Sequence, residues 1–295
     1  MTIKTFSPIL SLAACALAAM VPLPVLAAEA AARAAITKDL TFYASFDHGV
    51  DADFALGDAR LFTVVATKPE RKTEPGLHTA GATRLASGKG RRGNALEFTK
   101  REASWIFFDG FRNVDYRARD WSGTVSLWLK LDPETDLDPG FADPLQLTTR
   151  AWNDGSFFVD FNKDGDPRDF RLGAFSDLSF WNPGNKEIPE NQWPMLKVLS
   201  PPFGSDEWTH VVFTWRNFNI PGEEAVATLY MNGKKRGTIG GRTQTYTWKP
   251  EEQIFLYLGL NYIGLMDEVA CFGRALSDDE VMELHGLKGS VLTGL

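Results

Sequence analysis

The stretch LYLGLNYIGLMDEVACFGRALSDDEVMEL, residues 256–284, carries the strongest fold signal in the chain. It has the pattern of a strand, a turn marked by glycine, a second strand and a short helix. If side chains alternate along the second strand, one of its faces carries Leu265, Asp267, Val269 and Cys271. Because an unpaired carboxylate is costly to bury, we expect Asp267 to have a partner.

The helix in this stretch has recognisable ends. Ser277 stands at the expected N-cap and Glu280 follows three residues later, which is the pattern of a capping box. Gly286 would end the helix. The sequence therefore predicts one short C-terminal helix over Asp278–His285.

The rest of the chain contains short segments in which apolar and polar residues alternate, as in half-buried strands. The strand patterns cover Leu40–Phe46, Leu61–Ala66, Asn94–Phe98, Thr124–Leu131, Ser156–Asn162, Arg168–Ala174, Glu207–Trp215, Ala225–Asn232 and Lys235–Ile239. An Asp-Gly turn at Lys163–Asp166 predicts a hairpin, whereas Thr67–Ser87 has the pattern of an irregular excursion. Many short strands with one helix indicate an all-β, antiparallel sandwich.

Five segments also carry a family resemblance. They are FYASFD (42–47), WSGTVSLWLKL (121–131), EWTHVVFTW (207–215), ATLYMNGKKRG (227–237) and the closing residues 258–284. In this order they resemble the laminin-G-like domains of the concanavalin A-like lectin/glucanase superfamily. An uncharacterised exported bacterial group with this domain is resembled by the longer pieces DADFALGD (51–58), WSGTVSLWL (121–129), DPRDFRLG (166–173) and PPFGSDEWTHVVFTW (201–215). The resemblance implies an antiparallel two-sheet concanavalin A-like jelly-roll sandwich. Relative to a minimal domain, Asp132–Asp154 and Asp177–Pro202 are insertions.

The N-terminus has the pattern of a targeting segment. Lys4 precedes a largely apolar stretch, and Val25-Leu26-Ala27 offers a small-residue cleavage site. We expect a signal peptide over 1–28, a disordered Ala-rich remnant over 29–38, a laminin-G-like jelly-roll domain over 39–288 and a C-terminal tail over 289–295. The protein would then be secreted or periplasmic after cleavage near Ala27 or Ala28. Lipoprotein anchoring at Cys15 is the alternative; it is disfavoured because the residues after Cys15 stay apolar.

Composition excludes several classes of partner. The chain has 31 Lys and Arg against 38 Asp and Glu, a net charge of −7, and no basic run, which argues against nucleic acid and anionic membrane surfaces. No segment after the signal is long and apolar enough for an integral membrane span. Cys271 is the only cysteine left after cleavage, and we interpret it as an inert core residue.

The resemblance further implies a structural calcium ion (Ca²⁺) where the first and last strands lie side by side. Its place in this sequence corresponds to Asp47 and Asp267, to which Asp51 and Asp53 could add oxygen ligands. The alternative is that Asp267 pairs with an arginine or with backbone N–H groups, and that Asp47 only caps a turn.

Two further motifs have simpler explanations. Residues 160–166, DFNKDGD, match the first half of an EF-hand loop, but Arg171 stands where a bidentate Glu should close it, which favours a hairpin tip. Residues 88–93, GKGRRG, spell a dinucleotide-binding pattern without the strand before it or the helix after it. They predict a glycine turn that leads into a strand.

For ligand binding, the sequence favours a carbohydrate. Aromatic rings bury the apolar faces of sugars, while Asp, Asn and Arg bind pairs of hydroxyl groups. Between residues 151 and 182 the candidates are Trp152, Asn153, Asp154, Arg168, Asp169, Arg171, Trp181 and Asn182. The alternative is that the two tryptophans pack their loops.

The sequence predicts an exported, non-catalytic, lectin-like jelly-roll protein whose partner is a glycan or polysaccharide. The paired carboxylates of the glucanases and the Gln-x-His strand of the lyases of this fold are both missing. His210 is interpreted as a structural histidine. Two alternatives stay open: a polysaccharide-acting enzyme using Asp160, Asp169 or Asp177, and an adhesion or assembly module that binds other exported proteins.

Overall fold

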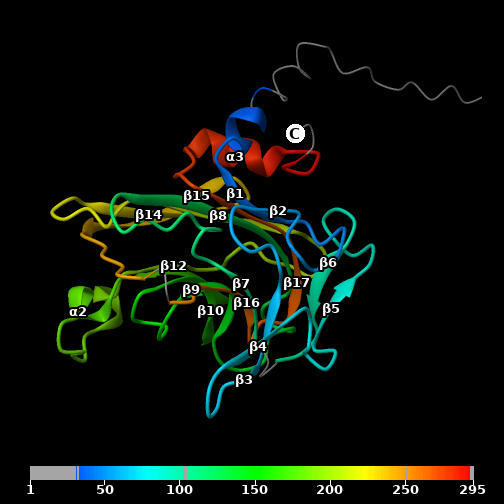
Figure 1. The fold of residues 1–295 in the computed structure, drawn as a ribbon, viewed down its shortest axis with the longest axis horizontal. Helices are drawn as coiled ribbons and strands as arrows, with labels where there is room; N and C mark the ends of the chain where they lie inside the picture. The colour runs from blue at the N-terminus through cyan, green and yellow to red at the C-terminus, as the bar shows by residue number, and fades with distance from the viewer. Residues whose placement is uncertain (1–30, 32, 102–104, 250–251, 293–295) are drawn as a thin grey trace, which may run out of the picture.

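Two antiparallel sheets pack face to face in the computed structural model, which describes residues 31, 33–101, 105–249 and 252–292. Figure 1 shows the two layers, with the C-terminal helix lying above one of them. The predicted all-β sandwich is therefore confirmed. The predicted signal peptide lies outside the described residues. Within them, no helix is both long enough and apolar enough to cross a membrane.

The nine-stranded sheet joins the two ends of the domain. Its main path runs through β15 (Lys234–Arg242), β14 (Ala225–Met231), β13 (Thr209–Phe218), β8 (Trp121–Lys130), β17 (Gly264–Phe272), β1 (Leu40–Ala44) and β2 (Phe54–Ala55). Beside this path, β6 (Ala95–Phe98) pairs with β17, and β5 (Thr83–Ala86) pairs with β6. The first strand, β1, pairs antiparallel with the last strand, β17. The glycine pattern at 88–93 is the turn between β5 and β6, as predicted.

The eight-stranded sheet contains the predicted hairpin. Its order is β12 (Met195–Val198), β11 (Arg168–Phe175), β10 (Ser156–Gly165), β9 (Ala142–Thr148), β16 (Phe255–Leu260), β7 (Ile106–Asp109), β3 (Phe62–Ala66) and β4 (Lys72–Pro75). The β10–β11 pair confirms the hairpin. Both predicted insertions supply strands of this sheet, β9 and β12. The predicted irregular excursion supplies β4 and β5. Their short or interrupted apolar patterns gave too weak a strand signal to be recognised.

The core lies between the sheets and is built from the inward-facing side-chain rows of the central strands. On β8 the inward row includes Val125, Leu127 and Leu129, and on β10 it includes Phe157 and Val159. Such alternation follows from the pleat, which sends successive side chains to opposite faces. The outward-facing side chains of both sheets are therefore available for contacts outside this core.

The outer face of the nine-stranded sheet is covered by helix α3 (Asp278–Gly286), whose predicted capping box between Ser277 and Glu280 is present. Residues 33–37 are also helical, contrary to the predicted disorder of 29–38, and Ile36 is fully buried in the cluster that contains Leu284. Ser290 of the predicted tail donates a hydrogen bond to the Tyr43 hydroxyl at 2.8 Å. Burial of Ile36 offsets the entropy cost of ordering its segment.

A β-bulge in β17 contradicts the expected single row of Leu265, Asp267, Val269 and Cys271. The register to β8 shifts between Asp267 and Ala270, and Glu268 has φ +54°. An extra residue at a bulge reverses the alternation beyond it. Asp267 therefore pairs with Trp128 on the outer side, while Val269 and Cys271 face the core.

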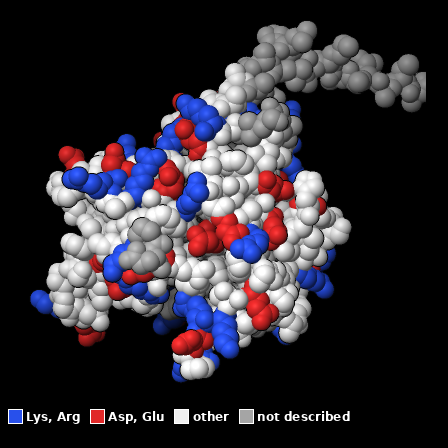
Figure 2. All heavy atoms as spheres, viewed as in Figure 1, with Lys and Arg blue, Asp and Glu red and all other residues white. Residues whose placement is uncertain are grey.

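Charges of both signs are interspersed over the face of the molecule shown in Figure 2. That distribution agrees with the absence of a basic run from the sequence.

We predict that Gly123→Ala lowers the free energy of unfolding by about 1–3 kcal/mol, because overpacking a tight core is destabilising. Gly123 lies opposite Trp215, and a Cβ there would be 2.2 Å from Cζ2 of that ring. Gly204→Ala is the matched control, since a Cβ at Gly204 meets nothing within 4 Å. Equal urea midpoints for the two variants would contradict the prediction.

Candidate functional site

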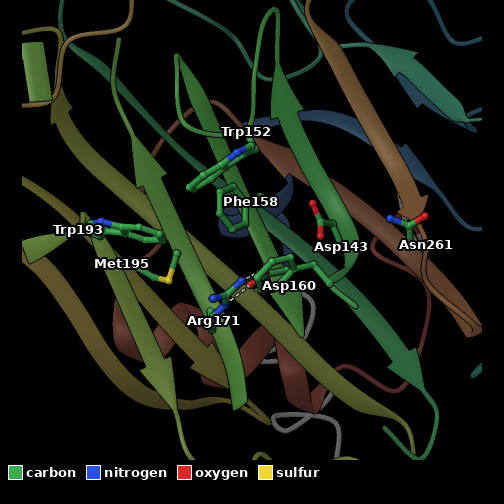
Figure 3. Close-up of a pocket in the computed structure, with 9 residues that line it drawn as sticks. Asp143, Trp152, Phe158, Asp160, Arg171, Trp193, Met195 and Asn261 are labelled. Carbon is green, nitrogen blue, oxygen red and sulfur yellow. Dashed lines mark hydrogen bonds and ion pairs between the residues drawn. The ribbon is translucent and has the colours of Figure 1, made fainter. Parts of the chain in front are cut away.

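A pocket of about 310 Å³ opens on the outer face of the eight-stranded sheet. It is lined by Phe141, Asp143, Trp152, Phe158, Asp160, Arg171, Trp193, Met195 and Asn261. Figure 3 shows Trp152, Phe158 and Trp193 gathered on one side, with Asp143 and Asn261 on the other. The pocket therefore combines an aromatic side and a polar side.

Strand alternation places the floor of the pocket. Phe157, Val159 and Phe161 of β10 point into the core, so Phe158 and Asp160 project outward. Opposite Phe158 on β11 stands Gly173, where a Cβ would come within 2.4 Å of the Phe158 ring. The missing side chain at Gly173 lets the ring lie over the neighbouring strand.

Two loop tryptophans form the aromatic wall. Trp152 comes from the β9–β10 connection, and Trp193 comes from the residues just before β12. Their ring centroids are 5.5 Å apart, and each ring also contacts Phe175. Trp152 keeps 47% of its surface exposed, so part of the wall is open to a ligand.

A buried ion pair lies beside this wall. Arg171 donates from Nε to Asp160 Oδ1 at 2.8 Å and from a second guanidinium nitrogen to Oδ2, so both carboxylate oxygens are occupied. The side chains of Arg171 and Asp160 are only 5% and 4% exposed. Burial raises the pKa of Asp160, while the hydrogen bonds and charge of Arg171 act to lower it. The same guanidinium lies over the Phe141 ring, 4.7 Å from its centroid.

Asp143 and Asn261 supply the remaining polar groups. Within the described part of the chain, no side-chain hydrogen bond satisfies the half-buried carboxyl group of Asp143. Surrounding protein atoms raise the pKa of Asp143 well above its usual range, and the charge of Asp160 raises it further, against the effect of Arg171. Asn261 Oδ1 accepts a hydrogen bond from Arg101 Nε at 2.9 Å.

Of the eight residues that the sequence proposed for ligand binding, only Trp152 and Arg171 line this pocket. Trp181 donates from Nε1 to the carbonyl oxygen of Asn153 at 2.9 Å, and Asp154 accepts the N–H of Leu178 at 2.8 Å. The Asn182 side chain is hydrogen-bonded to the backbone of Lys186. Asn153, Asp154, Trp181 and Asn182 thus hold the loops around α2 (Leu178–Trp181) together.

The other two proposed residues also lie outside the pocket. Arg168 is buried, and its guanidinium donates to the carbonyl oxygens of Leu137, Asp138 and Gly140. Asp169 is half-buried on β11. Arg168 therefore holds the loop before β9, a role that explains its burial.

Sequence reasoning missed most of the pocket. Phe158 could have been recognised as an outward aromatic residue on β10 from its alternation with Phe157 and Val159. Trp193, Met195 and Asn261 had no local signal, because they reach the pocket from two distant parts of the chain.

The two residues proposed for calcium accept backbone N–H groups of the β5–β6 turn. Asp47 Oδ1 accepts from Asn94 at 2.8 Å, and Asp267 Oδ2 accepts from Arg92 at 3.2 Å. Burial and the neighbouring Glu268 raise the pKa of Asp267 to about 8. No group of three or more His, Cys, Asp or Glu that could hold a metal ion occurs among the described residues. An ion here would therefore need backbone carbonyls or water as ligands, and calcium binding stays a prediction.

The remaining candidates have structural partners. Asp51 accepts the N–H of Leu61 at 2.9 Å, and Asp53 accepts the N–H of Ser45 at 2.7 Å. His210 is fully buried, with Nε2 2.8 Å from the Ser126 hydroxyl and its ring stacked on Trp128. These contacts agree with a structural role for His210.

A family model described as the concanavalin A-like lectin/glucanases superfamily matches residues 111–282. No curated protein matches the chain. Among solved structures, the botulinum neurotoxin serotype D binding domain is similar at a TM-score of 0.55 and 14% identity, covering 86% of this chain and 52% of that chain.

Two further solved structures have the same fold. The botulinum neurotoxin serotype D ligand binding domain in complex with N-acetylneuraminic acid has a TM-score of 0.51, with 12% identity over 86% of this chain and 52% of that chain. The binding domain of Paraclostridial Mosquitocidal Protein 1 also has a TM-score of 0.51, with 13% identity over 85% and 52%. The chain spans about half the length of these three solved chains. At such low identity the likeness shows the fold alone.

We predict that Arg171→Gln lowers the free energy of unfolding by about 3–5 kcal/mol, because it leaves the buried Asp160 carboxylate without its cation. The loss should grow between pH 5 and pH 8: without Arg171 the native carboxyl keeps its proton to higher pH, while the unfolded carboxyl ionises. Urea titrations at both pH values measure this. Arg216→Gln is the control, since Arg216 is exposed on β13.

Adding Asp160→Asn to Arg171→Gln should recover part of the loss, since the pair is then removed together. Additive effects of the two substitutions would contradict a direct ion-pair coupling.

Proposed function

We propose, from the premise that the chain belongs to the concanavalin A-like lectin/glucanases superfamily, that it is a non-catalytic carbohydrate-binding protein. The superfamily predicted from the strand motifs is confirmed by the match over residues 111–282. A sugar ring would occupy the pocket on the outer face of the eight-stranded sheet. As further parts of the proposal, the protein is exported after removal of residues 1–28, and residues 39–288 form its binding domain.

The observation that carries this proposal is the convergence of aromatic rings and open polar groups in one pocket. Trp152, Phe158 and Trp193 offer apolar surface against which the C–H face of a pyranose can pack. Asp143 accepts hydrogen bonds, and Asn261 both donates and accepts them. A concave, mostly apolar site with a few oriented polar groups is typical of small-ligand binding.

Similar folds in other proteins support the ligand class. The botulinum neurotoxin serotype D ligand binding domain has been solved in complex with N-acetylneuraminic acid. That protein shares the fold with this chain at 12% identity. At this identity the comparison supports only the class of ligand, and the residues of the pocket decide which sugar fits this chain.

The three carboxylates considered for an enzyme have partners or lie elsewhere. Arg171 occupies both oxygens of Asp160. Asp177 binds the hydroxyl and the N–H of Thr247, and Asp169 does not line the pocket. A glycosidase needs one carboxylate free to attack or to activate water and a second to donate a proton. These contacts favour binding over hydrolysis.

Trp152→Ala should weaken glycan binding roughly tenfold or more, because it removes an aromatic stacking surface. Phe180→Ala is the matched control: Phe180 is 57% exposed on α2, outside the pocket, and its loss should leave affinity unchanged. A glycan array identifies a ligand and calorimetry measures its affinity. No retention of any glycan would reject the proposal, shortened polysaccharide chains would indicate an enzyme, and capture of an exported protein alone would indicate an assembly module.

Calcium at Asp47 and Asp267 is a separate proposal. It requires Asp267 to ionise, and burial raises the pKa of this residue to about 8, so the test belongs at pH 8 or above. Excess calcium should raise the melting temperature relative to a chelator by an amount set by its occupancy. Asp267→Asn should abolish that difference. Coincident melting curves for the wild type would reject the site.

A further inference from the structure

The pocket has one more negative group than positive. Asp143, Asp160 and Arg171 are the charged side chains that line it. Arg171 uses two guanidinium nitrogens on Asp160, and its third nitrogen points to Glu190 Oε1 at 3.5 Å. Glu190 in turn accepts from Lys197 at 2.7 Å. Among the described residues, Asp143 is therefore left without a cation of its own.

The excess negative charge in the pocket is costly because Asp143 is partly shielded from water. A carboxylate near other protein atoms and a second carboxylate has lost much of its hydration, and no side chain in the described part of the chain replaces it. A positive group in the pocket would offset both effects, because the carboxylate would then have a partner of opposite charge. A cationic ligand would therefore form a charge-assisted hydrogen bond with Asp143, which is stronger than a neutral one.

The aromatic wall favours the same kind of ligand. Ring faces of Trp and Phe attract cations, most strongly where water is excluded. Phe141 at the rim already holds the Arg171 guanidinium in this way, 4.7 Å from the ring centroid. Trp152 and Trp193 stand on the opposite side of the pocket from Asp143 (Figure 3). A positive group between them would meet a carboxylate and aromatic rings together.

We infer that the natural ligand is an amino sugar with a free ammonium group, such as a glucosamine unit of a de-N-acetylated polysaccharide, with its ammonium at Asp143. This inference rests on the proposed sugar-binding function and narrows it. The sugar ring packs on the aromatic side, while the ammonium supplies the missing charge. Uronic and sialic acids are disfavoured, because their carboxylates would face Asp143 and Asp160.

Calorimetry with the purified full chain at pH 7 and three oligosaccharides of equal length tests this: glucosamine, N-acetylglucosamine and galacturonic acid. The glucosamine oligomer should bind about tenfold or more tightly than the N-acetylated one, as charge-assisted hydrogen bonds are roughly twice as strong as neutral ones. The galacturonic acid oligomer should bind most weakly. Asp143→Asn should remove the preference for the glucosamine oligomer over the N-acetylated one.

Asp164→Asn is the matched control, because it removes the same charge at the exposed tip of the β10–β11 hairpin, where the side chain is 71% exposed. Equal or tighter binding of the N-acetylated or galacturonic acid oligomer by the wild type would overturn the inference while leaving sugar binding intact. Failure of all three oligomers to bind, together with an empty glycan array, would overturn the proposed function itself. The wild-type comparison decides the matter even if Asp143→Asn does not fold.

Discussion

The two-residue period of the β-strand is the constraint on which this molecule depends. In the eight-stranded sheet the central strands give one row of side chains to the core and the other to the outer face. On β10, Phe157 and Val159 fill the interior, so Phe158 and Asp160 must face outward. The pocket is therefore built on strands whose positions the core already holds. A site on such a rigid platform needs little ordering when it binds a ligand, which reduces the entropy cost of binding.

The same constraint explains the exception in β17. One extra residue at Glu268 reverses the alternation, so that Asp267 and Glu268 both serve the outer side of the nine-stranded sheet. There, Glu268 accepts a hydrogen bond from the Tyr43 hydroxyl at 2.9 Å and pairs with Arg92. Burial raises the pKa of both carboxyl groups, and the charge of Glu268 raises that of Asp267 further. The β5–β6 turn supplies N–H groups and a guanidinium that act in the opposite direction. The glycine pattern at 88–93 is thus a partner of the closing strand, a role unrelated to nucleotides.

The charged groups of the pocket differ in whether they have a partner of opposite charge. Asp160 and Arg171 satisfy each other and hold two neighbouring strands together on the outer face. The charges of both groups act on Asp143, which has no ion-pair partner of its own in the part of the chain that the structure describes. A residue type cannot distinguish these cases, since an aspartate on an outward row is compatible with either. The distinction follows from which neighbours the sheet order places beside it, and β9 lies between β10 and β16.

The family resemblance implied that the first and last strands lie side by side. The sequence by itself determined the fold class, the β10–β11 hairpin and the capped C-terminal helix. These depend on local alternation, turn residues and capping, whose signals lie within a few residues of one another. Only the tertiary structure decided the pocket. Asp143 comes from a segment that had the pattern of an insertion, and Trp152, Trp193 and Asn261 come from three separate connections. The two tryptophans that the sequence proposed together have different roles. Trp152 lines the pocket, whereas Trp181 packs on Phe175 and holds its loop. Residues come together in this way through strand order and loop packing, and neither produces a periodic pattern in the amino-acid sequence.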